Sequence, residues 1–122
     1  MIYNPAEYQK ESIMYKKPVK RNDSLLYALV KNKILTGDYI FLKHAKDRQN
    51  ERLISDLDVL NILEGKTGFN RKRNKAKDHH EEGREDWNYC IEGVDFDRNS
   101  IRIIISFMDS LMPIITVMRI KK

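Results

Sequence analysis

The segment HAKDRQNER, from His44 to Arg52, combines residue types that could handle a phosphate and a proton. It places His44, Arg48 and Arg52 four residues apart, with Ala45 as its one apolar side chain. On an α-helix, positions four apart drift by only about 40° around the axis, so the three side chains would form one stripe. Arginine can donate two parallel hydrogen bonds to a phosphate, and histidine exchanges a proton near neutral pH. The same three residues could therefore serve the cleavage of RNA.

The stripe also has a plainer interpretation as a solvated helix face. Carboxylates at Asp47, Glu51, Asp56 and Asp58 lie close enough in the sequence to pair with its cations. Exposed ion pairs of this kind are common and contribute little to stability. Composition alone favours the plainer interpretation, so a functional one needs support from the position of the stripe in the fold.

A second basic segment, NRKRNKAKDHH from Asn70 to His80, follows Phe69. Its density of positive charge predicts contacts with nucleic-acid phosphates, which give affinity without sequence choice. A solubilising loop explains the segment equally well. Two lysines beside the stripe would extend the same contacts. The cations expected to touch RNA are Lys43, Lys46, Arg71, Lys72, Arg73, Lys75 and Lys77.

Two further arginines could join the phosphate site. Arg102 and Arg119 fall in neighbouring predicted strands, where cross-strand placement would bring them to one face. Alternatively, they carry the polar side of the sheet. Cys90 lacks the spaced, activating histidine that a nucleophile needs, so we expect a structural thiol there.

The run HHEE, from His79 to Glu82, contains residue types that bind metals. Adjacent residues point in different directions in most backbones, and no third ligand stands at a suitable spacing. We therefore expect neither a metal nor another cofactor.

Length and charge restrict the class of protein. The chain has 122 residues, of which 41% are hydrophobic and 34% charged, and this fits one domain with a modest core. Its net charge of +5 favours an anionic partner such as nucleic acid. Residues 39–77 hold ten basic and five acidic groups, whereas residues 78–122 hold six and nine. The middle third is therefore the segment that we expect to contact an anionic partner.

The sequence also indicates a cellular compartment. A single cysteine excludes an intrachain disulfide and fits a reducing environment. The chain contains no apolar run typical of a signal peptide or a membrane span. We expect a cytoplasmic protein without a membrane partner.

Periodicity and turn residues predict the order of the elements. Residues 1–22 show no clear period and are expected to form an N-terminal arm. A helix should follow an N-cap at Asp23 or Ser24 and end at Gly37, and YIFL should form a buried strand. A helix over 44–53 and another from the Ser55 cap to Gly65 should follow. Residues 66–86 are then expected to form a long basic loop.

The last third predicts a meander of three antiparallel strands over residues 87–94, 101–107 and 113–120. In the middle strand, Ile101, Ile103, Ile105 and Phe107 share one face, which should be the core face. We therefore predict a single α+β domain over residues 23–122, with helices packed on one face of a mostly antiparallel sheet.

Three segments together resemble a family of small prokaryotic proteins described as a domain of unknown function. They are HAKDRQNER, ISDLDV and ITV, at residues 44–52, 54–59 and 115–117. The family shows a His-Ala-x-x-Arg-x-x-Glu-Arg-like helix, an Ile-Ser/Thr-x-x-Asp-Val turn and a terminal Ile-x-Thr-Val strand. The resemblance extends over about residues 25 to 120, and the long basic segment 66–77 departs from it.

That family is in turn similar to the RelE, BrnT and MqsR toxins of toxin–antitoxin pairs. The resemblance implies a RelE-like architecture, RNA cleavage without a metal, and inhibition by a cognate antitoxin. Catalytic residues vary widely among these toxins, so only His44, Arg48 and Arg52 follow from the family pattern. Arg102 and Arg119 are added from the expected strand geometry.

Together these observations predict a metal-independent endoribonuclease toxin. His44 would act as acid or base, while Arg48, Arg52 and Arg102 or Arg119 would stabilise charge on the phosphate. The expected partners are RNA, including ribosome-bound messenger RNA, and a cognate antitoxin. The alternatives are a non-enzymatic RNA- or DNA-binding regulator on the same scaffold, or a module that binds protein alone.

Overall fold

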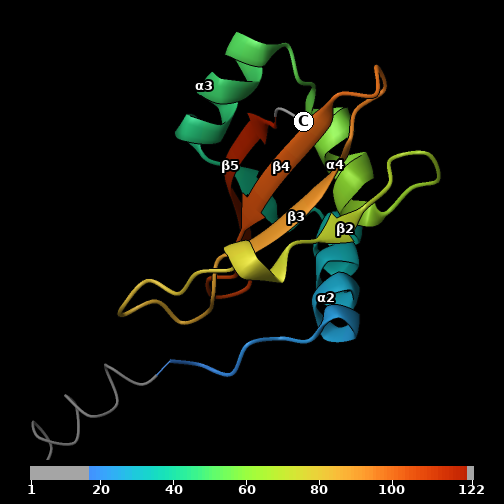
Figure 1. Cartoon of the computed structure of the whole chain (residues 1–122). Coiled ribbons are helices and arrows are strands. Elements are labelled where there is room, and N and C mark those ends of the chain that lie inside the picture. The colour runs from blue at the N-terminus through green and yellow to red at the C-terminus, as the bar shows by residue number, and fades with distance from the viewer. Residues whose placement is uncertain (1–16, 121–122) are drawn as a thin grey trace, which may run out of the picture.

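Five strands form one sheet against which three helices pack in the computed structural model, which describes residues 17–120 (Figure 1). The expected α+β class is confirmed. Of the expected arm over 1–22, residues 1–16 lie outside the described residues. Residues 17–22 run beside Trp87, whose Nε1 donates a hydrogen bond to the Pro18 carbonyl over 2.8 Å.

Helix α2 spans Asp23–Thr36, and its N-cap lies one residue before the first of the two expected caps, Asp23. Asn22 is the N-cap, and its Oδ1 accepts a hydrogen bond from the Leu25 amide over 2.9 Å. This leaves the Asp23 carboxylate free to pair with Arg73. The helix ends at Gly37, whose φ of 78° is the left-handed conformation that glycine adopts without strain.

The next three elements have nearly the bounds expected from the sequence. Strand β1 covers Tyr39–Phe41, and helix α3 covers Lys43–Arg52. The expectation of a buried strand is wrong, because β1 lies at the edge of the sheet and Ile40 is 46% exposed. Helix α4 covers Asp56–Glu64, and the Ser55 hydroxyl caps it by accepting a hydrogen bond from the Asp58 amide over 3.0 Å. The chain therefore turns sharply between α3 and α4, which brings the two helices into contact through polar side chains.

The segment expected to be a loop over 66–86 contains two short ordered pieces. Strand β2 at Lys72–Arg73 pairs antiparallel with β3, and a 3-10 turn, η1, covers Lys75–Lys77. A strand of two residues is too short to show an alternation of apolar and polar side chains in the sequence. Pairing with β3 is what orders it.

The predicted meander is confirmed as β3 (Tyr89–Val94), β4 (Ser100–Ile105) and β5 (Met112–Arg119). The full strand order is β1-β5-β4-β3-β2, in which only β1 and β5 run parallel. The sequence did not predict that β1 would join the meander beside its last strand. In Figure 1, α2 and α4 lie behind the strands and α3 lies beside β5.

One apolar core lies between the helices and one face of the sheet. On β4, Ile101, Ile103 and Ile105 are fully buried, as expected, and Phe107 beyond the strand is 5% exposed. They meet Leu26 and other buried side chains from α2, α3 and α4 in a single cluster. The opposite face of the sheet, here called the outer face, carries the alternate residues. Among them, Lys72, Glu92, Arg102 and Met118 stand in one cross-strand row.

Candidate nucleic-acid interface

Helix α3 carries the predicted stripe on its surface. His44, Arg48 and Arg52 are all exposed, whereas Ala45 and Gln49 are the two residues that the helix buries. Each stripe residue except Arg52 comes one position before a buried one, so the stripe lies about 100° around the helix from the buried line. The stripe therefore faces solvent along the flank of α3.

Some cations near the stripe are paired as the plainer interpretation expects. Arg48 contacts Glu51 over 3.3 Å, and Lys43 contacts Asp47 over 2.8 Å. These pairs are exposed to solvent and weak. Within residues 17–120, neither the His44 ring nor the Arg52 guanidinium has an ion-pair partner. The stripe thus keeps positive charge at its C-terminal end.

Lys46 connects α3 to α4 through an ion pair. Its amino group contacts Asp56 over 2.7 Å and lies 5.3 Å from the centre of the Phe41 ring. The buried Gln49 donates to the same carboxylate over 2.6 Å. Burial acts to raise the pKa of Asp56, but the hydrogen bonds from Lys46 and Gln49 outweigh it and hold that pKa below its usual value. Lys46 therefore ties two helices together.

The register of β4 and β5 corrects one expectation about the arginines. Arg102 pairs with Met118, whereas Arg119 pairs with Ile101. Because side chains alternate along a strand, Arg102 and Arg119 lie on opposite faces, and the expectation that they share one face is wrong. Arg119 instead reaches α3, where its Nη2 donates to the Arg52 carbonyl over 3.0 Å. It adds a second arginine at the C-terminal end of the stripe.

The basic segment 70–77 divides between the surface and the domain interior. The Arg71 guanidinium lies 3.7 Å from the centre of the Tyr27 ring and donates to the Leu63 carbonyl. Lys75 is exposed but lies 3.5 Å from Asp23. Lys72 and Lys77 are exposed and have no ion-pair partner within residues 17–120. Of the expected RNA contacts in this segment, these two lysines are the best placed.

Arg73 is enclosed, which its sequence context did not indicate. Its side chain is 1% exposed and pairs with Asp78 over 2.8 Å and with Asp23 over 2.9 Å. Its guanidinium also lies over the Tyr89 ring. Strand β2 pairs Arg73 with Ile91, which turns it toward the core face. A guanidinium held in this way cannot reach an external phosphate, so we withdraw Arg73 as an RNA contact.

The outer face carries a polar network that the sequence analysis missed. Glu92 accepts hydrogen bonds from the Arg102 Nε over 2.8 Å and from the Asn74 Nδ2 over 3.0 Å. Burial acts to raise the pKa of Glu92, but these donors outweigh it and lower that pKa overall. Glu92 is therefore ionised at neutral pH. Its position in an apolar strand is the only signal that the sequence offered.

Cys90 sits beside this network and is buried. Burial and the neighbouring Glu92 charge raise the pKa of its thiol to about 12. At neutral pH the sulfur is protonated and a poor nucleophile. This agrees with the structural role expected from the sequence.

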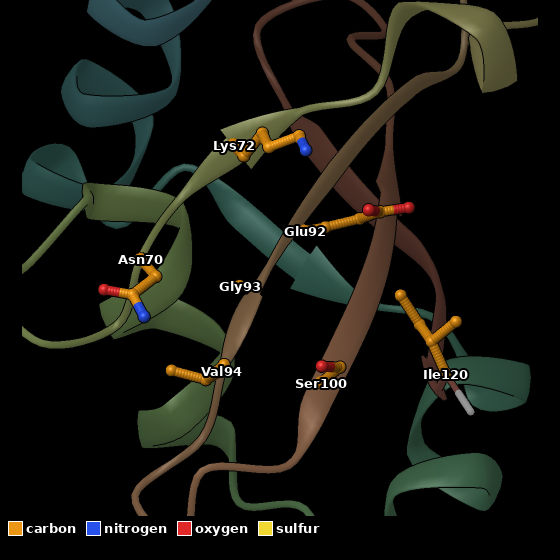
Figure 2. A pocket seen from close by; sticks show the side chains of 7 residues that line it. All are labelled: Asn70, Lys72, Glu92, Gly93, Val94, Ser100 and Ile120. Atoms are coloured by element: carbon orange, nitrogen blue, oxygen red, sulfur yellow. The ribbon is translucent and has the colours of Figure 1, made fainter. Parts of the chain in front are cut away.

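A pocket of about 350 Å³ opens on the outer face between β2, β3 and the end of β5 (Figure 2). Lys72 and Glu92 border it on one side, and Val94, Ser100 and Ile120 lie on the other. Ile120 follows Arg119, so the end of β5 connects the pocket to the C-terminal end of α3.

The histidines of the HHEE run do not belong to a group of side chains, among the described residues, that could bind a metal. His80 hydrogen-bonds through its Nε2 to the Arg84 carbonyl over 3.0 Å and packs against Trp87. Across residues 17–120, no three histidine, cysteine, aspartate or glutamate side chains gather closely enough to hold a metal ion. In the same part of the chain, no helix is both long and apolar enough to cross a bilayer.

Comparison of the chain with models of protein families, with curated proteins and with solved structures finds no significant match. The observations above define two features, the cationic stripe of α3 and the pocket of the outer face.

Proposed function

We propose that this protein is a metal-independent endoribonuclease and the toxin of a toxin–antitoxin pair. One observation carries the proposal: His44 and Arg52 stand exposed and without an ion pair within residues 17–120, and Arg119 donates a hydrogen bond to the Arg52 carbonyl at the C-terminal end of the stripe. A proton-transferring group and two guanidinium groups are thus available along one helix flank. A purely solubilising face would not need Arg119 to be held there.

The chemistry would follow the usual route of metal-independent RNA cleavage. The 2′-oxygen attacks the adjacent phosphorus as its proton leaves, the bond from phosphorus to the 5′-oxygen breaks, and that oxygen gains a proton. The products are a 2′,3′-cyclic phosphate and a 5′-hydroxyl. His44 would transfer one of these protons, and Arg48 and Arg52 would stabilise the extra negative charge on the phosphate. Arg119 would hold the same phosphate from the side of β5.

Affinity for RNA would come from further exposed cations. Lys72 and Lys77, which are exposed and have no ion-pair partner within residues 17–120, would contact phosphates, and Lys43 would join them by leaving its exposed pair with Asp47. Such contacts confer a strong dependence on salt. An antitoxin would most simply cover the stripe with acidic or apolar groups. We therefore expect a small partner protein to co-purify with the chain.

A non-enzymatic RNA-binding module is the second candidate. It is favoured by the surroundings of His44, which has no hydrogen-bonded side chain within residues 17–120 to orient its ring. An acid–base histidine is commonly held by such a partner. The binding module would use the same arginines for phosphates and perform no reaction.

One experiment separates the two candidates. The purified chain, freed of any partner, is incubated with a defined messenger RNA in EDTA, with and without translating ribosomes. Cyclic or 3′-phosphate ends should appear, and His44→Ala should reduce their formation by roughly 100-fold or more with little change in RNA affinity. His79→Ala, an exposed histidine away from α3, is the matched control and should cleave normally.

Intact RNA in every lane, from protein shown to be folded, would contradict the nuclease. If the binding module is correct, Arg52→Ala should then weaken RNA affinity and reduce its salt dependence, while His44→Ala should change little. Absence of RNA binding at moderate salt would contradict both and leave a protein-interaction module.

A further inference from the structure

The outer-face pocket has the size and lining of a ligand site. Its volume of about 350 Å³ falls near the lower end of the range for small-molecule sites, roughly 300 to 1,000 Å³. Apolar side chains at Val94 and Ile120 line it together with the polar Ser100. This combination suits a flat ring that buries its faces while its edges form hydrogen bonds.

Glu92 supplies an unused acceptor at the edge of this pocket. All three donors that contact its carboxylate, from Asn74, Arg102 and Cys90, reach the same oxygen, Oε2. Its other oxygen, Oε1, has no hydrogen-bond donor within residues 17–120. Because the donors on Oε2 also keep the side chain in place, Oε1 is a fixed, charged acceptor with vacant lone pairs.

Two cations flank that acceptor. Lys72 stands opposite Glu92 in the sheet register and has no ion-pair partner within residues 17–120. Figure 2 shows its amino group on the same side of the sheet as the Glu92 carboxylate. Arg102 binds Glu92 through Nε, and its two terminal nitrogens have no hydrogen-bond acceptor among residues 17–120. Positive charge for a phosphate therefore lies next to a negative acceptor for a hydrogen-bond donor.

We infer that this pocket binds a guanine nucleotide. Glu92 Oε1 accepts from the guanine N1–H and N2–H₂ groups, Val94 and Ile120 contact the ring, and Lys72 with Arg102 holds a phosphate. The inference rests on the proposed function only in taking RNA as the natural source of the base. A free nucleotide presents the same chemistry.

The choice of guanine follows from the pattern of donors on each base. Guanine places two donors side by side, with no acceptor between them. Adenine and cytosine place an acceptor nitrogen next to their amino group, and uracil flanks its N–H with two carbonyl oxygens. An acceptor facing a fixed carboxylate is repelled and left unpaired, which is how a polar site rejects the wrong ligand.

Titration with mononucleotides tests the inference on the full chain. Binding of 5′-GMP, AMP, CMP and UMP, and of inorganic phosphate, is measured by calorimetry in EDTA at about 50 mM salt, where phosphate contacts are screened least. GMP should bind roughly 10-fold more tightly than UMP, as expected when paired donors meet their acceptor. Equal affinities for the four nucleotides in the wild-type protein would overturn the inference.

Variants test whether the preference for guanine arises in this pocket. Glu92→Gln should abolish the guanine preference, whereas Asp97→Asn, an exposed carboxylate of the β3–β4 turn, should retain it. Lys72→Ala should weaken all four nucleotides alike and leave guanosine, which has no phosphate, little changed. Because Glu92→Gln also disturbs the bond to Arg102, Val94→Trp provides a second test by filling the pocket. Undiminished GMP binding by Val94→Trp would overturn the inference.

A comparison of ligands identifies the source of the base and separates this inference from the nuclease. A tetranucleotide that contains guanine should bind more tightly than GMP if RNA is the ligand, and no more tightly if a free nucleotide is. Guanine-selective binding without RNA cleavage would contradict the nuclease and leave the pocket. Cleavage without guanine-selective binding would overturn the pocket alone.

Discussion

The Arg119 guanidinium donates a hydrogen bond over 3.0 Å to the main-chain carbonyl of Arg52, the last residue of α3. The last four carbonyls of a helix have no partner inside it, and the partial negative charge at this end attracts cations. Arg119 therefore caps α3 from the neighbouring strand. The bond fixes the C-terminal end of the stripe against β5.

Replacing Arg119 should reveal both a structural and a binding role. Arg119→Ala should lower the free energy of unfolding by about 1 kcal/mol, the typical net value of such a hydrogen bond, and weaken RNA affinity. The matched control is Arg98→Ala, since Arg98 likewise donates to a main-chain carbonyl, that of Gly68. Urea unfolding and RNA titration measure the two effects. Equal loss of RNA affinity in both variants would contradict a specific role for Arg119.

The buried Arg73 should matter for stability. Arg73→Met leaves the fully buried Asp78 carboxylate without its main partner, and breaking a buried ion pair typically costs roughly 3 to 5 kcal/mol. Lys77→Met, an exposed change in the same segment, should cost little. Chemical unfolding of both variants checks the difference. A stable Arg73→Met protein with reduced RNA affinity would instead show that Arg73 reaches the ligand.

Leu53 offers a stabilising substitution. It ends α3 with φ of 57° and is 89% exposed, so it occupies the left-handed region without burying its side chain. A residue with a side chain is destabilised by roughly 1 kcal/mol in this region. Leu53→Gly should therefore raise the melting temperature. Ala28→Gly, at an exposed position within α2, should lower it by removing a good helix former. A lower melting temperature for both variants would contradict the strain at Leu53.

The ionised Glu92 carboxylate should make the free energy of unfolding fall as the pH is lowered. Burial acts to raise its pKa, but the hydrogen bonds from Asn74 and Arg102 lower it below the ordinary value of 4.5. The folded chain therefore holds the carboxylate ionised more strongly than the unfolded chain does. Its contribution is complete above the unfolded pKa and is lost as pH falls through the folded pKa. Urea midpoints measured between roughly pH 3 and pH 7 should decline less steeply for Glu92→Gln than for wild type.

The helices and the meander could be predicted because their signals are local. Ser55 caps α4 through the amide three residues ahead, and Gly37 and Gly65 end helices in a conformation that side chains disfavour. The alternation of Ile101, Ile103 and Ile105 marks a half-buried strand without reference to the rest of the chain. The exposed stripe on α3 likewise follows from residue type and a period of 3.6.

Pairing between segments far apart in the chain determines how these elements are arranged. The parallel contact of β1 with β5, the opposite faces of Arg102 and Arg119, and the burial of Arg73 all depend on register between distant segments. A shift of one residue would exchange the two faces of a strand, and no local pattern in a two-residue strand fixes that register. The sequence by itself determined the helices, the meander and the candidate stripe. Only the tertiary structure decided which cations remain on the surface and that Lys72 stands opposite Glu92 in the sheet, because both depend on pairing between residues far apart in the chain.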